Sequence, residues 1–127
     1  MEYFEMDCPC KGKNLDKLLQ PAILKILYDR NMHGFMLIEQ LGDNPMFGGT
    51  SPDKAGVYRY LKKMEESGLL SSGWENGAEC EKPRRVYAIT DKGRGCLGNW
   101  LEALKKYTGS IDMLIKDIED TVDSAAI

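Results

Sequence analysis

One stretch of the chain, residues 51–90, limits the possible fold more than any other, because a helix pattern is followed there by a hairpin pattern. A helix is predicted to start at Ser51, whose hydroxyl can accept hydrogen bonds from free backbone N–H groups, with Pro52 at the first helical position. Four apolar residues then recur at helical spacing, namely Val57, Tyr60, Leu61 and Met64. Gly68 ends this amphipathic helix.

Two strand patterns follow the helix. Residues 69–74 are predicted as a first strand, and residues 85–90 alternate as the returning strand. The polar segment between them, residues 75–82, makes the turn and ends on basic residues. A helix, a strand, a basic loop and a second strand, in this order, are typical of a winged helix. The predicted fold is therefore mainly α with a small β-hairpin, a winged helix-turn-helix domain followed by a C-terminal dimerisation helix.

Apolar residues also recur at helical spacing from Leu15 to Leu27. Pro21 falls inside this run, and proline interrupts a helix by removing a backbone donor. We therefore expect a short helix to about Leu19 and a second one that starts near Pro21.

A turn is predicted at residues 32–34, followed by a helix over residues 35–41 that Gly42 terminates. One face of this helix carries Phe35, Ile38 and Leu41. His33 is the only histidine in the chain, and no serine or cysteine arrangement accompanies it that would make it a catalytic base. We expect it to fix the turn by hydrogen bonding, and no enzyme is predicted.

The C-terminal segment carries a heptad seam. Its apolar residues step by three and four positions, as in a helix that buries one stripe against another helix: Leu97, Trp100, Leu104, Tyr107, Ile111, Leu114 and Ile118. Gly109-Ser110 predicts a bend or break in its middle. Because so long a seam is hard to bury within one small subunit, a dimerisation helix is predicted, joined by the apolar residues at the other end of the chain, Leu15, Leu18 and Leu19.

The length of 127 residues and a hydrophobic content of 43% fit one globular domain. We expect a polar leader over residues 1–14, a winged helix-turn-helix over residues 15–92 and a dimerisation helix over residues 93–127. The N-terminus lacks a signal-peptide pattern, and no apolar run reaches the ~20 residues of a membrane helix. A cytoplasmic protein without a membrane partner is predicted.

The net charge of −3 argues at first against a nucleic-acid partner. Lysine and arginine, however, predominate in residues 54–63 and 82–94, whereas acids gather near both ends of the chain. Charges more than a Debye length of about 10 Å away are largely screened, so a phosphate backbone responds to the local basic patch. The charge distribution is compatible with binding to double-stranded DNA.

The predicted DNA contacts lie on the outward face of the 51–68 helix and on the hairpin. The full set is Ser51, Lys54, Tyr58, Arg59, Lys62, Lys82, Arg84 and Arg85. Arg59 and Lys62 are predicted to reach bases or phosphates, and Tyr58 a phosphate or sugar. Because Arg84 and Arg85 alternate sides on a strand, we expect one of them to face DNA and the other to pair with an acid. A solvated basic surface is the alternative.

With these residues in place, the chain resembles the PadR family of bacterial transcriptional regulators, over roughly residues 15–108. The matching segments are Pro21-Ala22-Ile23-Leu24, His33-Gly34-Phe35, Gly56-Val57-Tyr58-Arg59-Tyr60-Leu61 with Glu65, Gly68-Leu69-Leu70, Pro83-Arg84-Arg85-Val86-Tyr87 with Ile89-Thr90, and Gly93. Position 35 is more often tyrosine in the family.

The resemblance implies a homodimeric repressor whose C-terminal helix packs against the partner subunit. It also implies a small hydrophobic or aromatic effector near the dimer interface, for which Trp100, Leu104 and Tyr107 are the candidate contacts. Two copies related by symmetry would read an operator that is an inverted repeat. The alternatives are a winged-helix protein-interaction module and a metal- or thiol-responsive regulator.

The alternative of a metal- or thiol-responsive regulator depends on the cysteines. A Cys-x-Cys pair, Cys8 and Cys10, supplies two ligands, whereas structural zinc sites use four, and Cys96 is a further candidate. Inert, reduced thiols are the favoured interpretation, with no metal and no cofactor.

Overall fold

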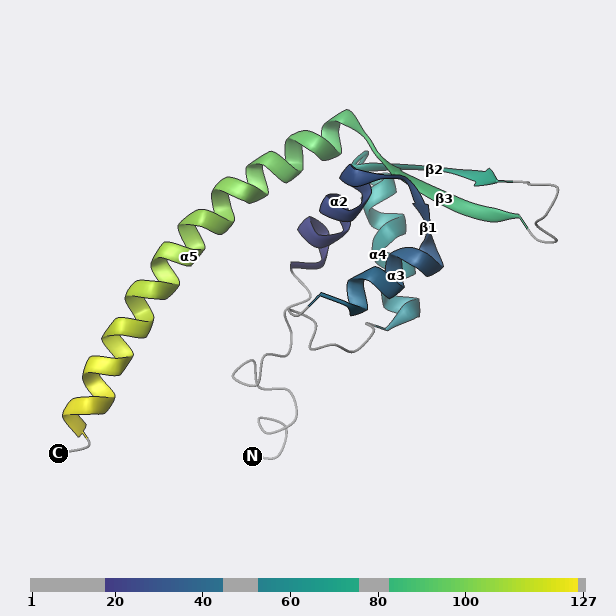
Figure 1. Ribbon diagram of the computed structural model, residues 1–127. Coiled ribbons are helices and arrows are strands. Elements are labelled where there is room, and N and C mark those ends of the chain that lie inside the picture. The colour runs from purple at the N-terminus through teal and green to yellow at the C-terminus, as the bar shows by residue number, and fades with distance from the viewer. Residues whose placement is uncertain (1–17, 45–52, 76–82, 126–127) are drawn as a thin grey trace. The chain divides into compact units, whose positions relative to one another are not determined.

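The computed structural model describes residues 18–44, 53–75 and 83–125. Along the chain the elements are α2 (Leu19–Asp29), β1 (Met32–His33), α3 (Gly34–Gly42), α4 (Lys54–Glu66), β2 (Leu70–Glu75), β3 (Arg84–Ile89) and α5 (Asp91–Ala125). Figure 1 shows α2, α3 and α4 gathered beside the strands, with β2 and β3 extending beyond them as the wing. The predicted fold class, mainly helical with a small β-sheet in a winged helix, is confirmed.

The described strands form one antiparallel sheet in the order β1-β3-β2. In its register Leu70 lies opposite Ile89, and Met32 lies opposite Tyr87. The predicted turn at residues 32–34 is therefore wrong for Met32 and His33, which form the short strand β1. A strand of two residues is too short to show an alternating pattern in the sequence, so only its pairing with β3 reveals it.

A core of apolar side chains lies between the helices and the sheet. The buried residues are Leu19, Ile23, Leu24, Leu27, Met32, Leu37, Ile38, Leu41, Val57, Leu61, Met64, Leu69, Leu70, Tyr87 and Ile89. Phe35 is 53% exposed, so its predicted place on the buried face of α3 is wrong. Leu37 takes that place, and at about 100° per residue Phe35 points to the opposite side of the helix from Leu37.

One helix start agrees with prediction and one differs. Helix α2 begins at Leu19, near the predicted start at Pro21, and continues through Pro21 because the first turn of a helix has no use for the missing N–H. The short helix predicted to end at about Leu19 lies mainly outside the described residues. Helix α4 is capped by Asp53, whose carboxylate accepts a hydrogen bond from the Gly56 N–H at 3.2 Å, and not by Ser51. Both residues are good caps, and the chain uses the one nearer the first buried position.

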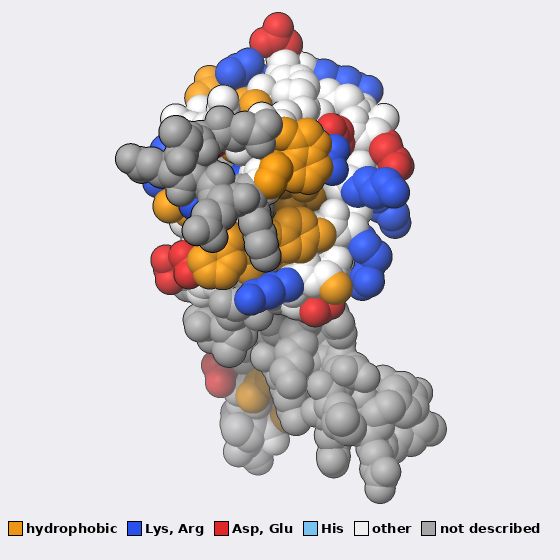
Figure 2. Space-filling model, turned by 90° about the vertical axis from the view of Figure 1, so that its right-hand side faces the viewer, with side chains coloured by type: hydrophobic (Ala, Val, Ile, Leu, Met, Phe, Trp, Pro, Cys, Tyr) orange, Lys and Arg blue, Asp and Glu red, His pale blue; other side chains and the backbone are white. Residues whose placement is uncertain are grey.

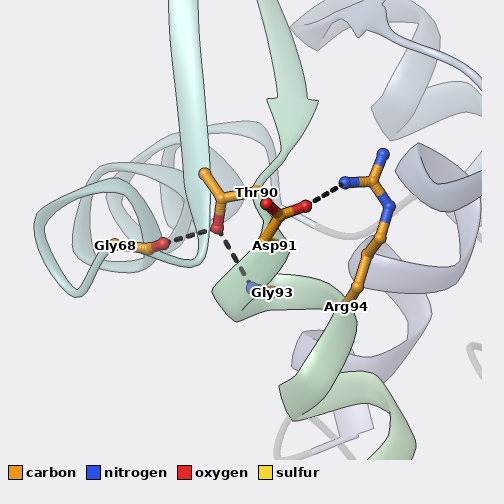
Figure 3. A network of polar contacts seen from close by, with 5 residues as sticks. All are labelled: Gly68, Thr90, Asp91, Gly93 and Arg94. Carbon is orange, nitrogen blue, oxygen red and sulfur yellow. Dashed lines mark hydrogen bonds and ion pairs between the residues drawn. The ribbon is translucent and has the colours of Figure 1, made fainter.

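The end of α4 is tied to the start of α5 by a small polar network (Figure 3). The Thr90 hydroxyl donates to the Gly68 carbonyl at 2.6 Å and accepts from the Gly93 N–H at 3.0 Å. Gly68 has a positive φ of 82°, as predicted for the residue that ends α4. Gly93 is buried against Leu69, which leaves no room for a side chain. This network fixes where the last helix leaves the winged domain.

The chain divides into two compact units, residues 1–97 and residues 98–127. The second unit is the continuation of α5, which runs as one helix through Gly109 and Ser110, so of the predicted bend or break the break is wrong. A glycine inside a helix costs only about 1 kcal/mol relative to alanine, which the long flanking helical segments tolerate. No helix in the described part of the chain is long and apolar enough to cross a bilayer.

Candidate nucleic-acid interface

The outward face of α4 carries the predicted basic residues. Lys54, Arg59 and Lys62 are exposed, whereas Val57 and Leu61 on the opposite face are buried in the core. Among the described residues no hydrogen bond or ion pair engages Arg59 or Lys62. This face is therefore available to an external anion.

An aromatic edge borders this face. A Cβ atom on Gly34 would lie 2.5 Å from Cε1 of Tyr58, so the glycine allows the tyrosine ring to pack against the start of α3. Tyr58 keeps 43% of its surface exposed, and the Lys54 ammonium lies 5.5 Å from the centroid of the Phe35 ring. The Lys54 ammonium therefore lies beside an aromatic ring at the edge of this basic face. Sequence reasoning missed this use of Phe35.

The two wing arginines point to opposite faces of β3. Arg85 shares its face with the buried Tyr87, and it forms an ion pair with Glu65 of α4 at 3.7 Å. Arg84 is on the other face, where its guanidinium lies 3.4 Å from Nε2 of His33. Arg85 is thus the arginine that pairs with an acid. His33 of β1 contacts Arg84 of the neighbouring strand β3, and it has no described role in a turn.

Two hollows lie on this part of the surface. One, of about 630 Å³, is lined by Tyr58, Lys62, Glu65, Glu66, Trp74, Arg85 and Tyr87. The other, of about 460 Å³, is lined by His33, Gly34, Phe35, Tyr58, Pro83, Arg84 and Arg85. Tyr58 and Arg85 line both hollows and so connect α4 with the wing. Figure 2 views the molecule from the side that lies at the right in Figure 1. It shows apolar side chains in the middle of this face, with lysine and arginine side chains around them.

The electrostatic setting of Tyr87 reflects the same arrangement. Burial raises the pKa of its phenol above the ordinary value, and the nearby Arg85 guanidinium opposes this effect. The Glu65 carboxylate adds a smaller upward contribution to the pKa.

Some predicted site residues lie outside the described part of the chain. These are Ser51, Lys82, Leu15, Cys8 and Cys10. Cys96 is half-buried, and its thiol donates to Oε1 of Gln20 at 3.8 Å. No group of three metal-ligating side chains occurs among the described residues.

The candidate dimerisation residues fall into two groups. Leu19 is buried in the core of the first unit, and Leu18 is half-buried. Tyr107, Ile111, Leu114 and Ile118 are all more than half exposed, whereas Trp100 and Leu104 are half-buried. Only the α5 residues therefore form an extended apolar stripe in the described chain.

The model of the transcriptional regulator PadR-like family matches residues 23–99, which are more than half of the chain. The chain belongs to this family. The matched region contains α3, α4, the hairpin and the start of α5. This family consists of transcriptional regulators, and the winged helix of this PadR-like regulator is the fold that carries the candidate interface. Among proteins with curated functions, none matches the chain.

Solved structures agree with the family. A PadR family transcriptional regulator from Eggerthella lenta is 26% identical, with a TM-score of 0.67 over 78% of this chain and 82% of that one. The protein TA0346 from Thermoplasma acidophilum is 30% identical, with a TM-score of 0.69 over 80% of this chain and 94% of that one. Bacillus subtilis PadR in complex with operator DNA shares the fold at 23% identity, with a TM-score of 0.56 over 66% of this chain and 45% of that one.

Proposed function

We propose that this PadR-like protein is a sequence-specific, double-stranded-DNA-binding regulator that inserts α4 into the major groove. The observation that carries the proposal is that Lys62 of α4 and Arg84 of the wing line two hollows that share Tyr58, with Arg59 exposed next to Tyr58 on the same helix. Helix-turn-helix domains dock by placing their second helix in the major groove while neighbouring elements hold phosphates. The operator complex of the related B. subtilis protein supports the same use of the fold.

Each basic residue has a distinct part in this proposal. Arg59 and Lys62 project from the middle of α4, where the helix reaches base edges or the flanking phosphates. Lys54 and Tyr58 lie nearer the start of α4 and contact the sugar-phosphate backbone of the DNA, with the tyrosine hydroxyl donating to a phosphate. Arg84, on the exposed face of the wing, holds a phosphate by its charge.

We further propose a homodimer formed through α5. Its apolar stripe is more than half exposed at Ile111, Leu114 and Ile118, and a second copy of the same helix would cover it at the spacing of a heptad seam. A symmetric dimer presents two recognition helices. The operator is then an inverted repeat with half-sites about one helical turn, roughly 10 base pairs, or a multiple of it apart.

The regulatory part of the proposal is repression relieved by a small hydrophobic or aromatic effector. Trp100, Leu104 and Tyr107 are its candidate contacts, because they lie on the stripe where two copies of α5 would meet. As a regulator of transcription, the protein would act in the cytoplasm with the chromosome. An effector that changes how the two helices pack would change the spacing of the recognition helices and so release the operator.

The deciding experiment measures affinity for the promoter of the protein's own operon and for scrambled DNA over a salt series. Arg59→Ala, if Arg59 reads a base, should cost about 1–3 kcal/mol per site and relax preference at one position of each half-site. Arg84→Ala should weaken binding to both DNAs alike and reduce the salt slope by roughly one per subunit. Lys25→Ala, at an exposed position of α2, is the charge-matched control and should leave binding unchanged. Unchanged affinity in every variant would favour a protein-interaction module instead.

A further inference from the structure

A closed polar network joins the recognition helix to both strands of the wing. The Ser72 hydroxyl donates to Oε2 of Glu65 at 2.7 Å, and it accepts from Nε of Arg85 at 2.8 Å. The Arg85 guanidinium then lies 3.7 Å from Oε1 of Glu65. Because a hydroxyl has one proton to give and lone pairs to accept with, Ser72 uses both roles at once. The three residues come from α4, β2 and β3, so the network spans the angle between helix and wing.

Arg85 has a further partner on the wing. Trp74 is its cross-strand neighbour, and the guanidinium lies 5.5 Å from the centroid of the indole ring. The Arg85 guanidinium thus contacts the Glu65 carboxylate, the Ser72 hydroxyl and the Trp74 ring within the chain. Arg84, in contrast, has a single described contact at 3.4 Å, with the imidazole of His33. A phosphate would therefore compete with Glu65 for the Arg85 guanidinium.

The position of Glu65 gives the network a second consequence. Its carboxylate lines the same hollow as Lys62 on the proposed DNA-binding side, where an unpaired negative charge would repel phosphates. Arg85 neutralises that charge in place. The pair is 48% and 30% exposed, so its contribution to folding stability is small, as for most surface ion pairs. Its effect is expected in geometry and not in stability.

We infer that Arg85 is a positioning residue and that the Glu65–Ser72–Arg85 network sets the angle of the wing against the recognition helix. This inference rests on the proposed DNA-binding function and refines it, because it separates two adjacent arginines. Arg84 contacts the phosphate, whereas Arg85 acts through Glu65 and Ser72 to place Arg84. A correct wing angle lets α4 and the wing engage the same duplex together, as two linked sites do.

Ser72 provides the sharpest test, because its replacement removes both hydrogen bonds of the network without changing any charge. Ser72→Ala should weaken operator binding about threefold to tenfold, the effect of losing roughly one net hydrogen bond's worth of positioning, with an unchanged salt slope. Ser71→Ala, an exposed neighbour on the same strand, is the matched control and should bind like the wild type. Ser72→Thr retains the hydroxyl and should restore affinity. Thermal unfolding of each variant checks that the fold is intact.

A second set of variants separates positioning from phosphate contact. The double variant Glu65→Gln/Arg85→Ala removes the ion pair without leaving an unpaired carboxylate on the DNA-binding side. It should weaken binding with an unchanged salt slope, and adding Ser72→Ala should weaken binding no further. Arg84→Ala should instead lower the slope by roughly one per subunit. A reduced slope for the double variant, or Ser72→Ala binding like Ser71→Ala, would overturn the inference. Absence of operator binding by the wild type would overturn the proposed function itself, so the two failures are distinguishable.

Discussion

The two units of the chain differ in how they treat their apolar residues. In the described part of residues 1–97, helices α2, α3 and α4 each bury one apolar face, and Leu61 of α4 has no exposed surface at all. In the described part of residues 98–127 no side chain is buried, and Leu114 is 57% exposed and Ile118 51% exposed. The first unit has a hydrophobic core of its own, whereas the described part of the second has none.

This difference shows what amphipathic patterning requires. Helix α4 and the end of α5 both carry apolar residues at helical spacing, but those of α4 are buried, whereas Leu114 and Ile118 of α5 are more than half exposed. Burial contributes roughly 25 cal/mol for each Å² of apolar surface, so an uncovered stripe forgoes that stabilisation until another surface arrives. A second copy of α5 is the occupant that we propose.

The largest effect is expected from substitutions that disrupt the proposed dimer interface of the second unit. Replacing Leu114 and Ile118 with glutamate should convert the proposed dimer to monomer or aggregate, because charges buried without partners are costly. Light scattering coupled to size-exclusion chromatography measures the change. Lys116→Glu, on the opposite side of the same helix, alters the net charge by the same amount and should preserve the dimer. A soluble dimer in the double variant would show that the stripe is not the interface.

A smaller effect is expected where the first unit closes around the start of α5. A Cβ atom at Gly93 would lie 2.3 Å from the Leu69 carbonyl oxygen, so Gly93→Ala should destabilise the protein by about 1–3 kcal/mol or more. Gly95→Ala, in the same helix with no atom within 4 Å, should instead stabilise it by up to about 1 kcal/mol. Urea unfolding of both variants gives the comparison. Equal stability would mean that the helix start shifts freely against the sheet.

The smallest expected effect concerns the pH dependence of the first unit. Burial raises the pKa of Tyr87 above its ordinary 10.0, so the neutral phenol is favoured in the folded chain. Its stabilising contribution is complete below about pH 10 and is lost as the pH rises through the folded pKa, because the unfolded chain releases its proton first. Unfolding free energies measured across this range should fall more steeply for the wild type than for Tyr87→Phe. Parallel curves would show that Tyr87 titrates alike in both states.

Several features of the fold could be predicted from the sequence because they depend on local rules. The apolar spacing of Val57, Leu61 and Met64 identified the buried face of α4, and Gly68 ends that helix in the left-handed conformation that glycine adopts without strain. The strand pattern identified the hairpin, and the order of these motifs pointed to the PadR family. Alternation along β3 also predicted that Arg84 and Arg85 would have different surroundings.

Only the tertiary structure decided the choices among equal local alternatives. Ser51 and Asp53 are both suitable caps, Phe35 and Leu37 both suit a core, and Met32 and His33 are too few to show a strand pattern. The pairing of Arg85 with Glu65 joins residues 20 positions apart and depends on how β3 lies against α4. The physical reason is that periodicity along a chain specifies which face of an element is apolar, whereas the partner of each side chain depends on the register and packing of elements distant in sequence.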